Sequence, residues 1–555
     1  MSRGAARLAL LLRSSRSSSS ASVAPSLASF VSNLSQAEVL KTPGGAKARL
    51  ASVLEGGQAS VNHLIDYIAL AHKEFTPADV ELLSKELAVS HSNLGEIRAD
   101  KVAVALQKLI NLNIQQSKAS NTLFRLLLTL PLSSYKNSES VVPLYEVFNA
   151  FSAKETVDGP WAADFKALLE ERSKNTSIYS DLVYLYRRSP ELRSNCLQAL
   201  RNLLPKLQIN EHISLLEELA AGKDANGRDM IDPLVTEIAN NPVPLSTRQV
   251  ASLAKVCSDL RIHNMRMKMK LSKDAIPVID QIEKWNDART IVTLFSAWRT
   301  PSDEVWKRLG DWAKKNADSA KFKDLAAVVT SMARAGRAEG GPVARIMAKR
   351  MRSEKTAPYT WLTNVHSLAY YKYMSSRLAE NVLGKDFMDE ILATTKDSAR
   401  PNILQMLMQI NECASNELKG GYGGPRLDRS VVTPGDEGAA MAARYGRCLP
   451  GVQSFRSALR RALGDPDVTR PRLLPCGTVV EAVSEDMVVI WAGDNRLYLT
   501  ENEERLMGTD EMSVRLLEAQ GKRVVVFTQR EMAHHREIAQ AIIHIKQRIK
   551  QRINA

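Results

Sequence analysis

The sequence predicts a mostly α-helical protein in which a helical-repeat α-solenoid is followed by a small C-terminal α/β domain. Aromatic residues make up only 6% of the 555 residues, while Leu, Ala, Ser and long charged residues dominate, which favours helices over β-sandwiches. Blocks of apolar residues at helical spacing recur through the middle of the chain, and valine-rich stretches follow near its end. The chain is also too long for a single hydrophobic core.

Four segments are expected along the chain. Residues 1–37 predict a disordered presequence, and residues 38–414 predict a helical-repeat domain. Residues 415–474 are rich in Gly and Pro, which indicates a linker or long loop. Residues 475–555 predict an α/β domain that ends in a basic helix.

The first segment has the composition of an organelle-import signal. It contains four arginines, a serine cluster and a short apolar run, but no Asp, Glu or Lys. A membrane potential drives such positive charge into the mitochondrial matrix, which is the location we expect. Plastid presequences share this composition, and a basic disordered tail without a targeting role is the alternative.

The middle of the chain repeats one apolar pattern. Its blocks begin at residues 213, 250, 291, 325, 361 and 403, so successive starts are 37, 41, 34, 36 and 42 residues apart. This spacing suits two helices and two turns per repeat. Second helices with Lys and Arg beside their apolar stripe lie between the blocks, for example at residues 305–315 and 343–351. We extend the solenoid upstream to segments that keep the helical period at irregular spacing: residues 103–114, 122–130 and 181–188.

Charge narrows the class of partner. The chain has 75 Lys and Arg against 61 Asp and Glu, and its formal net charge of +14 favours RNA, DNA or an anionic membrane surface. No stretch of about 18 apolar residues occurs, so no membrane span is expected. The five cysteines are isolated from one another, which indicates neither a disulfide framework nor a zinc site. We expect no metal and no cofactor.

Fifteen basic residues are candidates for contacts with RNA. Five lie within thirteen positions that contain no acid, three form a second cluster at residues 349–352, and seven flank the last predicted strand or line the final helix. Clustered Lys and Arg can neutralise successive phosphates, although a solvated helix face is the alternative for any single cluster. The candidates are Arg261, Arg266, Lys268, Lys270, Lys273, Lys349, Arg350, Arg352, Lys522, Arg523, Arg530, Lys546, Arg548, Lys550 and Arg552.

The C-terminal segment predicts strands at residues 478–483, 487–491, 496–499 and 523–527, with a helix at about 510–520 and a closing helix over 531–552. The block of a leucine pair, a glycine, a basic residue and a valine-rich strand is formed by Leu516, Leu517, Gly521, Lys522 and residues 524–526. In this order the elements resemble a RAP domain over residues 476–552.

The resemblance implies a function. RAP domains are C-terminal modules of organellar proteins whose upstream helical repeats bind RNA, as in the FAST-kinase-like, octotricopeptide and heptatricopeptide groups. Their repeat spacing is similar to the one found here. RAP domains in turn resemble the restriction-endonuclease-like fold, in which carboxylates from adjacent strands hold a metal ion that activates water.

Catalysis is not expected, because the carboxylates of that fold are missing. The family's strand commonly carries Glu and Asp just before a glycine, and the matching positions here are Ile490 and Ala492. Asp494, Glu485 and Asp486 lie nearby, but one carboxylate and solvent make a weak metal site. The G-x-x-x-x-G-K-[ST], H-E-x-x-H and G-x-S-x-G motifs do not occur either.

The expected function is therefore non-catalytic binding of mitochondrial RNA in RNA stability, maturation or translation. A constitutive subunit of the mitochondrial ribosome, in contact with ribosomal RNA and ribosomal proteins, is the main rival. The second rival class is an RNA endonuclease, and the third is a protein scaffold that acts without RNA.

Overall fold

A computed structural model of the chain forms two compact units, residues 1–205 and 206–555. The predicted presequence, residues 1–37, and the candidate Arg352 lie outside the residues that the structure describes. The described residues are 65, 68, 97–111, 118–130, 135, 139–152, 160–222, 227–351, 357–396, 398–418, 420–428, 451–499, 504–535 and 537–554.

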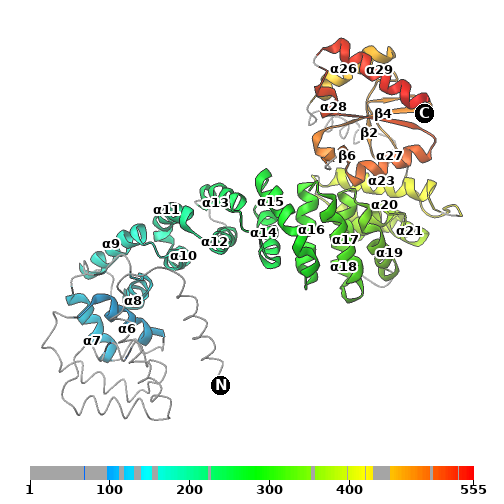
Figure 1. Cartoon of the computed structure of the whole chain (residues 1–555). Helices are drawn as coiled ribbons and strands as arrows, with labels where there is room; N and C mark the ends of the chain where they lie inside the picture. Colours follow the sequence, from blue (N-terminus) through cyan, green and yellow to red (C-terminus); the bar gives the residue numbers. More distant parts are fainter. Residues whose placement is uncertain are drawn as a thin grey trace. The chain divides into compact units, whose positions relative to one another are not determined.

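The first unit is built from packed helices, as its helical period predicts. α6 packs against α7 and α8, α8 against α9, and α11 against both α9 and α10 (Figure 1). Aromatic rings fill part of the core, where Phe124 stacks on Phe151 with 4.0 Å between ring centroids and meets Trp161 edge-on. The helices are α6 (Ala99–Asn111), α7 (Lys118–Thr129), α8 (Val142–Ser152), α9 (Pro160–Asn175), α10 (Tyr179–Arg188) and α11 (Arg193–Leu203).

The second unit begins with a row of helix pairs, which confirms the predicted helical repeat. The first helix of each pair packs against the first helix of the next pair, from α12 to α14, α16, α18, α20 and α23 (Figure 1). We call these the A helices: α12 (Ile209–Gly222), α14 (Thr247–Asp259), α16 (Trp285–Trp298), α18 (Phe322–Arg334), α20 (Pro358–Tyr370) and α23 (Arg400–Asn416). All six apolar blocks found in the sequence lie in A helices.

The second helices form the other layer of the row. α13 packs against α15, and α17 packs against α19. Several helices of this unit begin with a side chain that accepts a backbone N–H, as Asn264 does for α15 and Ser302 for α17. The second helices are α13 (Arg228–Asn240), α15 (Met265–Ala275), α17 (Asp303–Lys315), α19 (Gly341–Arg350), α21 (Ser376–Leu383) and α22 (Lys385–Thr394).

Four successive A helices end in the same left-handed turn. The turn residues are Arg261, Arg299, Gly336 and Lys372, with φ of 53°, 52°, 66° and 61°. They are 38, 37 and 36 residues apart. In each turn the following N–H donates to a carbonyl of the last helical turn, for example Thr300 N to Phe295 O at 3.0 Å and Arg337 N to Met332 O at 2.9 Å. This turn therefore marks the repeat period more regularly than the apolar blocks do.

The C-terminal region is a small α/β domain, as predicted. Strand β4 pairs in parallel with β7, with Met487 opposite Arg523 at one end and Ala492 opposite Thr528 at the other. On its other side β4 pairs antiparallel with β3. Helices α26 and α29 cover one face of this sheet, and α27 covers the other (Figure 1). The elements are α26 (Val452–Leu463), β1 (Arg472–Leu473), β2 (Val479–Val480), β3 (Ala482–Val483), β4 (Met487–Ala492), β5 (Leu497–Leu499), β6 (Glu504–Leu506), α27 (Gly508–Ala519), β7 (Arg523–Thr528), α28 (Gln529–Ala533) and α29 (Ile538–Asn554).

The domain differs from the sequence prediction at several places. The strand predicted at residues 478–483 is divided into β2, which pairs with the unpredicted β1, and β3, which pairs with β4. α26 falls within residues 415–474 and packs Phe455 and Leu459 into the core of the sheet, which the Gly and Pro content of this range did not indicate. The closing helix is divided into α28 and α29, because the chain leaves the helix after Ala533 and resumes at Ile538. The hairpin of β5 and β6 contains a strand, Glu504–Leu506, that is too short and too polar to be recognised from the sequence.

The cysteines in the described residues are free thiols, and all of them are buried: Cys196, Cys257, Cys413 and Cys476. Burial raises the pKa of Cys196, Cys257 and Cys476 to about 12. They act as small apolar core residues.

Candidate nucleic-acid interface

The C-terminal domain sits on the C-terminal ends of the A helices. Arg515 of α27 donates to Tyr370 O at the end of α20 at 2.6 Å, and it forms an ion pair with Glu417 beyond α23 at 2.8 Å. Gly508, the first residue of α27, lies so close to α18 that a Cβ there would overlap Ala333 O. These contacts fix helix α27 against the repeats.

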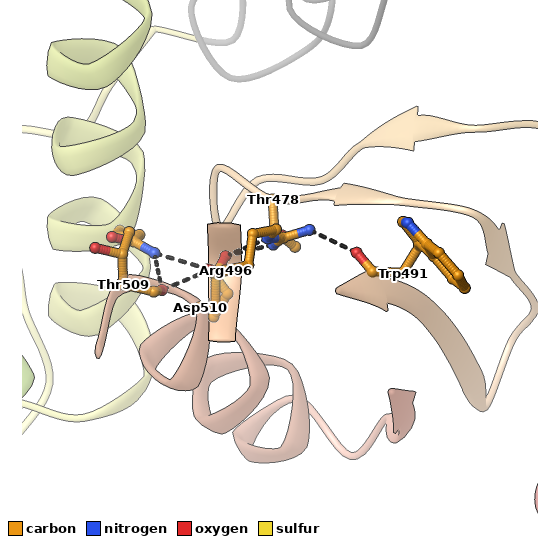
Figure 2. A network of polar contacts seen from close by, with 7 residues as sticks. Thr478, Trp491, Arg496, Thr509 and Asp510 are labelled. Atoms are coloured by element: carbon orange, nitrogen blue, oxygen red, sulfur yellow. Dashed lines mark hydrogen bonds and ion pairs between the residues drawn. The ribbon is translucent and has the colours of Figure 1, made fainter. Parts of the chain in front are cut away.

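Arg496 joins the end of β4 to α27. Its guanidinium donates to Trp491 O at 3.0 Å and to Thr478 Oγ1 at 3.2 Å, and its Nε donates to Asp510 Oδ1 at 2.9 Å (Figure 2). Both charged residues are buried. A glutamine side chain of α23 donates to Thr509 O at 2.8 Å beside this network. The network holds the carboxyl end of β4 in a fixed position.

An exposed ridge of basic and methionine side chains runs along α15. Met265 and Met269 are 65% and 66% exposed, and they share a helix face with Arg266 and Lys273 because 265, 269 and 273 are four residues apart. Arg261 lies exposed in the preceding turn. None of the three cations forms an ion pair with a described residue, and Arg266 Nη1 only approaches an asparagine oxygen at 3.5 Å. We call these five residues the basic ridge.

The other two basic residues of that sequence cluster stabilise the repeats instead. Lys268 Nζ donates to Trp298 O at 2.5 Å and to Arg299 O at 2.9 Å, at the end of α16. Burial, with a smaller effect from the charge of Arg299, lowers the pKa of Lys268 to about 8. Lys270 forms an ion pair with Asp274 at 2.9 Å, and its side chain is only 8% exposed.

A cavity of about 770 Å³ lies beside the basic ridge, between the turns after α14 and α16 and the C-terminal domain. Lys268, Arg299 and Arg530 reach its wall from three separate segments, together with Asp494 and Glu504. Arg299 donates to backbone carbonyls of the β5 region, and Arg530 Nη1 lies 3.8 Å from Glu504 Oε1. Met265 of the ridge also lines this cavity. We call it the basic cleft.

Other candidates are spread over the second unit rather than gathered at the cleft. Lys349 is exposed at the end of α19, whereas Arg350 donates to a backbone carbonyl beyond α17 at 3.0 Å. Arg352 lies outside the described residues. Lys522 and Arg523 lie at the start of β7, where Arg523 pairs with a carboxylate of the β3–β4 turn at 2.9 Å. They are thus at the opposite end of β7 from Arg530.

The candidates on α29 form an exposed basic stripe. Lys546 and Lys550 are exposed and have no ion pair with a described residue. Arg548 Nε pairs with Glu531 of α28 at 3.0 Å, and Arg552 pairs with a carboxylate of α27 at 2.6 Å. These two arginines therefore connect α29 to the rest of the domain.

The acids that a nuclease would need lie apart. Glu485 precedes β4 and Asp494 follows it, so the strand, at about 3.3 Å per residue, separates them by roughly 20 Å. Ile490 and Ala492 are buried apolar residues of β4. Among the described residues, no group of three or more His, Cys, Asp or Glu is placed to hold a metal ion.

Sequence reasoning missed Arg299, which lines the basic cleft together with Lys268. A signal for it was present, because Arg299 follows Arg261 by 38 residues and both occupy the left-handed turn of the repeat. Glycine is the usual residue in that conformation, as at Gly336, because a side chain at positive φ is sterically unfavourable. A basic residue at this position is therefore unusual.

No protein-family model and no curated protein matches the chain. In the part of the chain that the structure describes, every helix is too short or too polar to cross a membrane.

Proposed function

We propose that the chain binds organelle RNA through the basic ridge and the basic cleft, without covalent chemistry, and acts in RNA stability, maturation or translation in the mitochondrial matrix. The observation that carries the proposal is the basic ridge. Arg266 and Lys273 share one exposed face of α15 with two methionines, and Arg261 is exposed in the turn before it. None of these three cations pairs with a carboxylate of the described residues, so phosphates and unstacked bases would find charge and apolar surface side by side.

The basic cleft supports the same proposal. It continues from the ridge at Met265 and adds Lys268, Arg299 and Arg530 to the cations that a strand would meet. The excess of 75 Lys and Arg over 61 Asp and Glu provides a long-range field that attracts polyanions. The separation of Glu485 from Asp494 favours binding over cleavage.

A RAP-like identity of the C-terminal domain and an organelle address at residues 1–37 belong to this proposal. Helix α27 leads through Gly521 into the valine-rich strand β7, and α29 closes the domain, which is the order of elements that the resemblance implies. The likeness of RAP domains to restriction endonucleases would then describe the fold of this domain and not its activity.

Salt-dependent RNA binding tests the proposal. We expect the full chain to bind an unstructured RNA with an affinity that falls steeply with salt, measured by fluorescence anisotropy. Changing Arg261, Arg266 and Lys273 together to Gln should lower the slope of log K against log salt by about 2, because each phosphate contact with a single strand contributes about 0.7.

A matched variant separates RNA binding by the basic ridge from a general effect of the protein's charge. Lys307, Lys314 and Lys315 are exposed on α17, and changing all three to Gln removes the same charge outside the ridge. The proposal is wrong if both triple variants weaken binding equally, or if the unmodified chain does not bind RNA.

Crosslinking in isolated organelles distinguishes the roles that RNA binding could serve. Reads concentrated on the ends of one transcript would support a maturation or stability factor. Reads concentrated on ribosomal RNA, with co-sedimentation of the chain with a ribosomal subunit through high salt, would support the ribosomal role. No enriched RNA would favour the scaffold.

A further inference from the structure

A second cavity, of about 670 Å³ and open to solvent, lies in the C-terminal domain beside the basic cleft. Its wall includes Phe455 of α26, Trp491 of β4, Gln529 and Ala533 of α28, and His535. Trp491 is the last residue but one of β4, and Gln529 directly follows β7. The cavity is therefore at the carboxyl ends of two parallel strands, where open α/β sheets bind their ligands.

Two buried polar atoms of this wall have no hydrogen-bond partner among the described residues. They are Nε1 of Trp491 and Oε1 of Gln529. Trp491 is only 2% exposed, and its ring stacks on Phe455 with 4.8 Å between centroids. A buried polar atom without a partner is unfavourable, so the fold retains an unused donor and an unused acceptor beside two stacked aromatic rings. A nucleobase has a flat apolar face with acceptors and donors along its edge, which is the complementary chemistry.

The two cavities share part of their walls. Gln529 and Ala533 line both the 670 Å³ cavity and the basic cleft. A ligand in the 670 Å³ cavity would thus pass Gln529 to reach the basic cleft, whose wall carries Lys268, Arg299 and Arg530 beside Asp494 and Glu504. An aromatic cavity next to a cationic one matches a base joined through a ribose to a phosphate.

We propose that these cavities form a pocket for one nucleoside monophosphate unit, with the base between Trp491 and Gln529 and the phosphate in the basic cleft. The unit is either one nucleotide of a bound RNA or a free mononucleotide. In the first case the inference rests on the proposed function and extends it, since the C-terminal domain would hold one unstacked nucleotide of the strand that crosses the ridge.

The direct test is calorimetric titration of the full chain with AMP, GMP, CMP and UMP. We expect saturable binding of at least one of them at one site per chain. Trp491→Phe removes the indole N–H and keeps an aromatic ring, and Gln529→Met removes the amide oxygen at similar volume. Each should weaken binding about tenfold, while Gln547→Met on the exposed side of α29 should leave it unchanged.

The phosphate end is tested by comparing a nucleotide with its nucleoside. Arg530 is exposed at the rim of the cleft, so Arg530→Gln should fold normally. It should weaken AMP binding several-fold and leave adenosine binding unchanged. Equal loss for both ligands would contradict the placement of the phosphate.

Competition with RNA identifies the source of the nucleotide and keeps the two proposals separate. If AMP displaces an oligoribonucleotide and Trp491→Phe weakens RNA binding, the pocket holds a nucleotide of the RNA. If AMP binds and RNA affinity does not change, the pocket takes a free mononucleotide. If RNA binds but no mononucleotide does, and Trp491→Phe and Gln529→Met bind RNA normally, the pocket is refuted and RNA binding stands.

Discussion

Replacing Gly508 by Ala tests whether the C-terminal domain is locked onto the repeats. The added Cβ would overlap Ala333 O at the end of α18, and it would lie 2.9 Å from the carbon of that carbonyl and 3.2 Å from Gly336 N. All three atoms belong to the backbone, so no side chain can rotate away. Overpacking typically costs about 1–3 kcal/mol, and we expect the upper end because α27 and α18 must separate.

Hydrogen exchange locates this effect, and urea unfolding measures it. A loss of about 3 kcal/mol in the free energy of unfolding corresponds to roughly a hundredfold faster amide exchange. The faster exchange should appear at residues 508–519 and at the end of α18. Gly423→Ala is the matched control, because nothing lies within 4 Å of a Cβ at Gly423. The reasoning fails if the Gly508→Ala variant is as stable to urea as the Gly423→Ala variant and the amides of α27 exchange equally slowly in both.

Three further predictions follow from the buried charges and thiols. Burial lowers the folded-state pKa of Lys268 to about 8, so the unfolded chain keeps this proton to higher pH than the folded chain does. The free energy of unfolding in urea should therefore rise between about pH 8 and 10, and Lys268→Met should flatten that rise. Arg496→Leu leaves the buried carboxylate of Asp510 without its partner and should cost about 3 kcal/mol in urea unfolding, whereas Arg523→Leu breaks an exposed pair and should cost less than about 1 kcal/mol. In a Cys448→Ser variant the four buried thiols should react with a disulfide reagent only after unfolding; fast labelling of the native chain would contradict their burial.

The sequence predicted the helical repeat and the main strands of the C-terminal domain because periodic apolar patterns report them directly. The block at residue 291 lies in α16, and the valine-rich residues 523–527 lie in β7. Helix α26 was missed because glycines and prolines surround it, although Val452, Phe455 and Leu459 keep a helical spacing. Local pattern therefore sufficed wherever an element buries a regular face.

The cavities could not be predicted in this way, because they are formed by packing between distant segments. Lys268 and Arg530 belong to different candidate clusters, and the packing of the C-terminal domain against the repeats brings them to one wall. The unpartnered atoms of Trp491 and Gln529 are equally invisible in the sequence, where both residues look like ordinary members of a strand and of a turn.

The predicted RNA contacts show why a count of basic residues overstates a binding surface. In a stacked repeat each turn exposes carbonyls at the end of a helix, and a neighbouring lysine or arginine can satisfy them. Lys268 and Arg350 do this, at the end of α16 and beyond α17, so their hydrogen bonds to these carbonyls also stabilise the array. Only cations that lack such a partner can bind phosphate without weakening the fold. That criterion selects Arg261, Arg266 and Lys273 from the first cluster. It predicts that their removal lowers RNA affinity at unchanged stability, whereas removal of Lys268 lowers both.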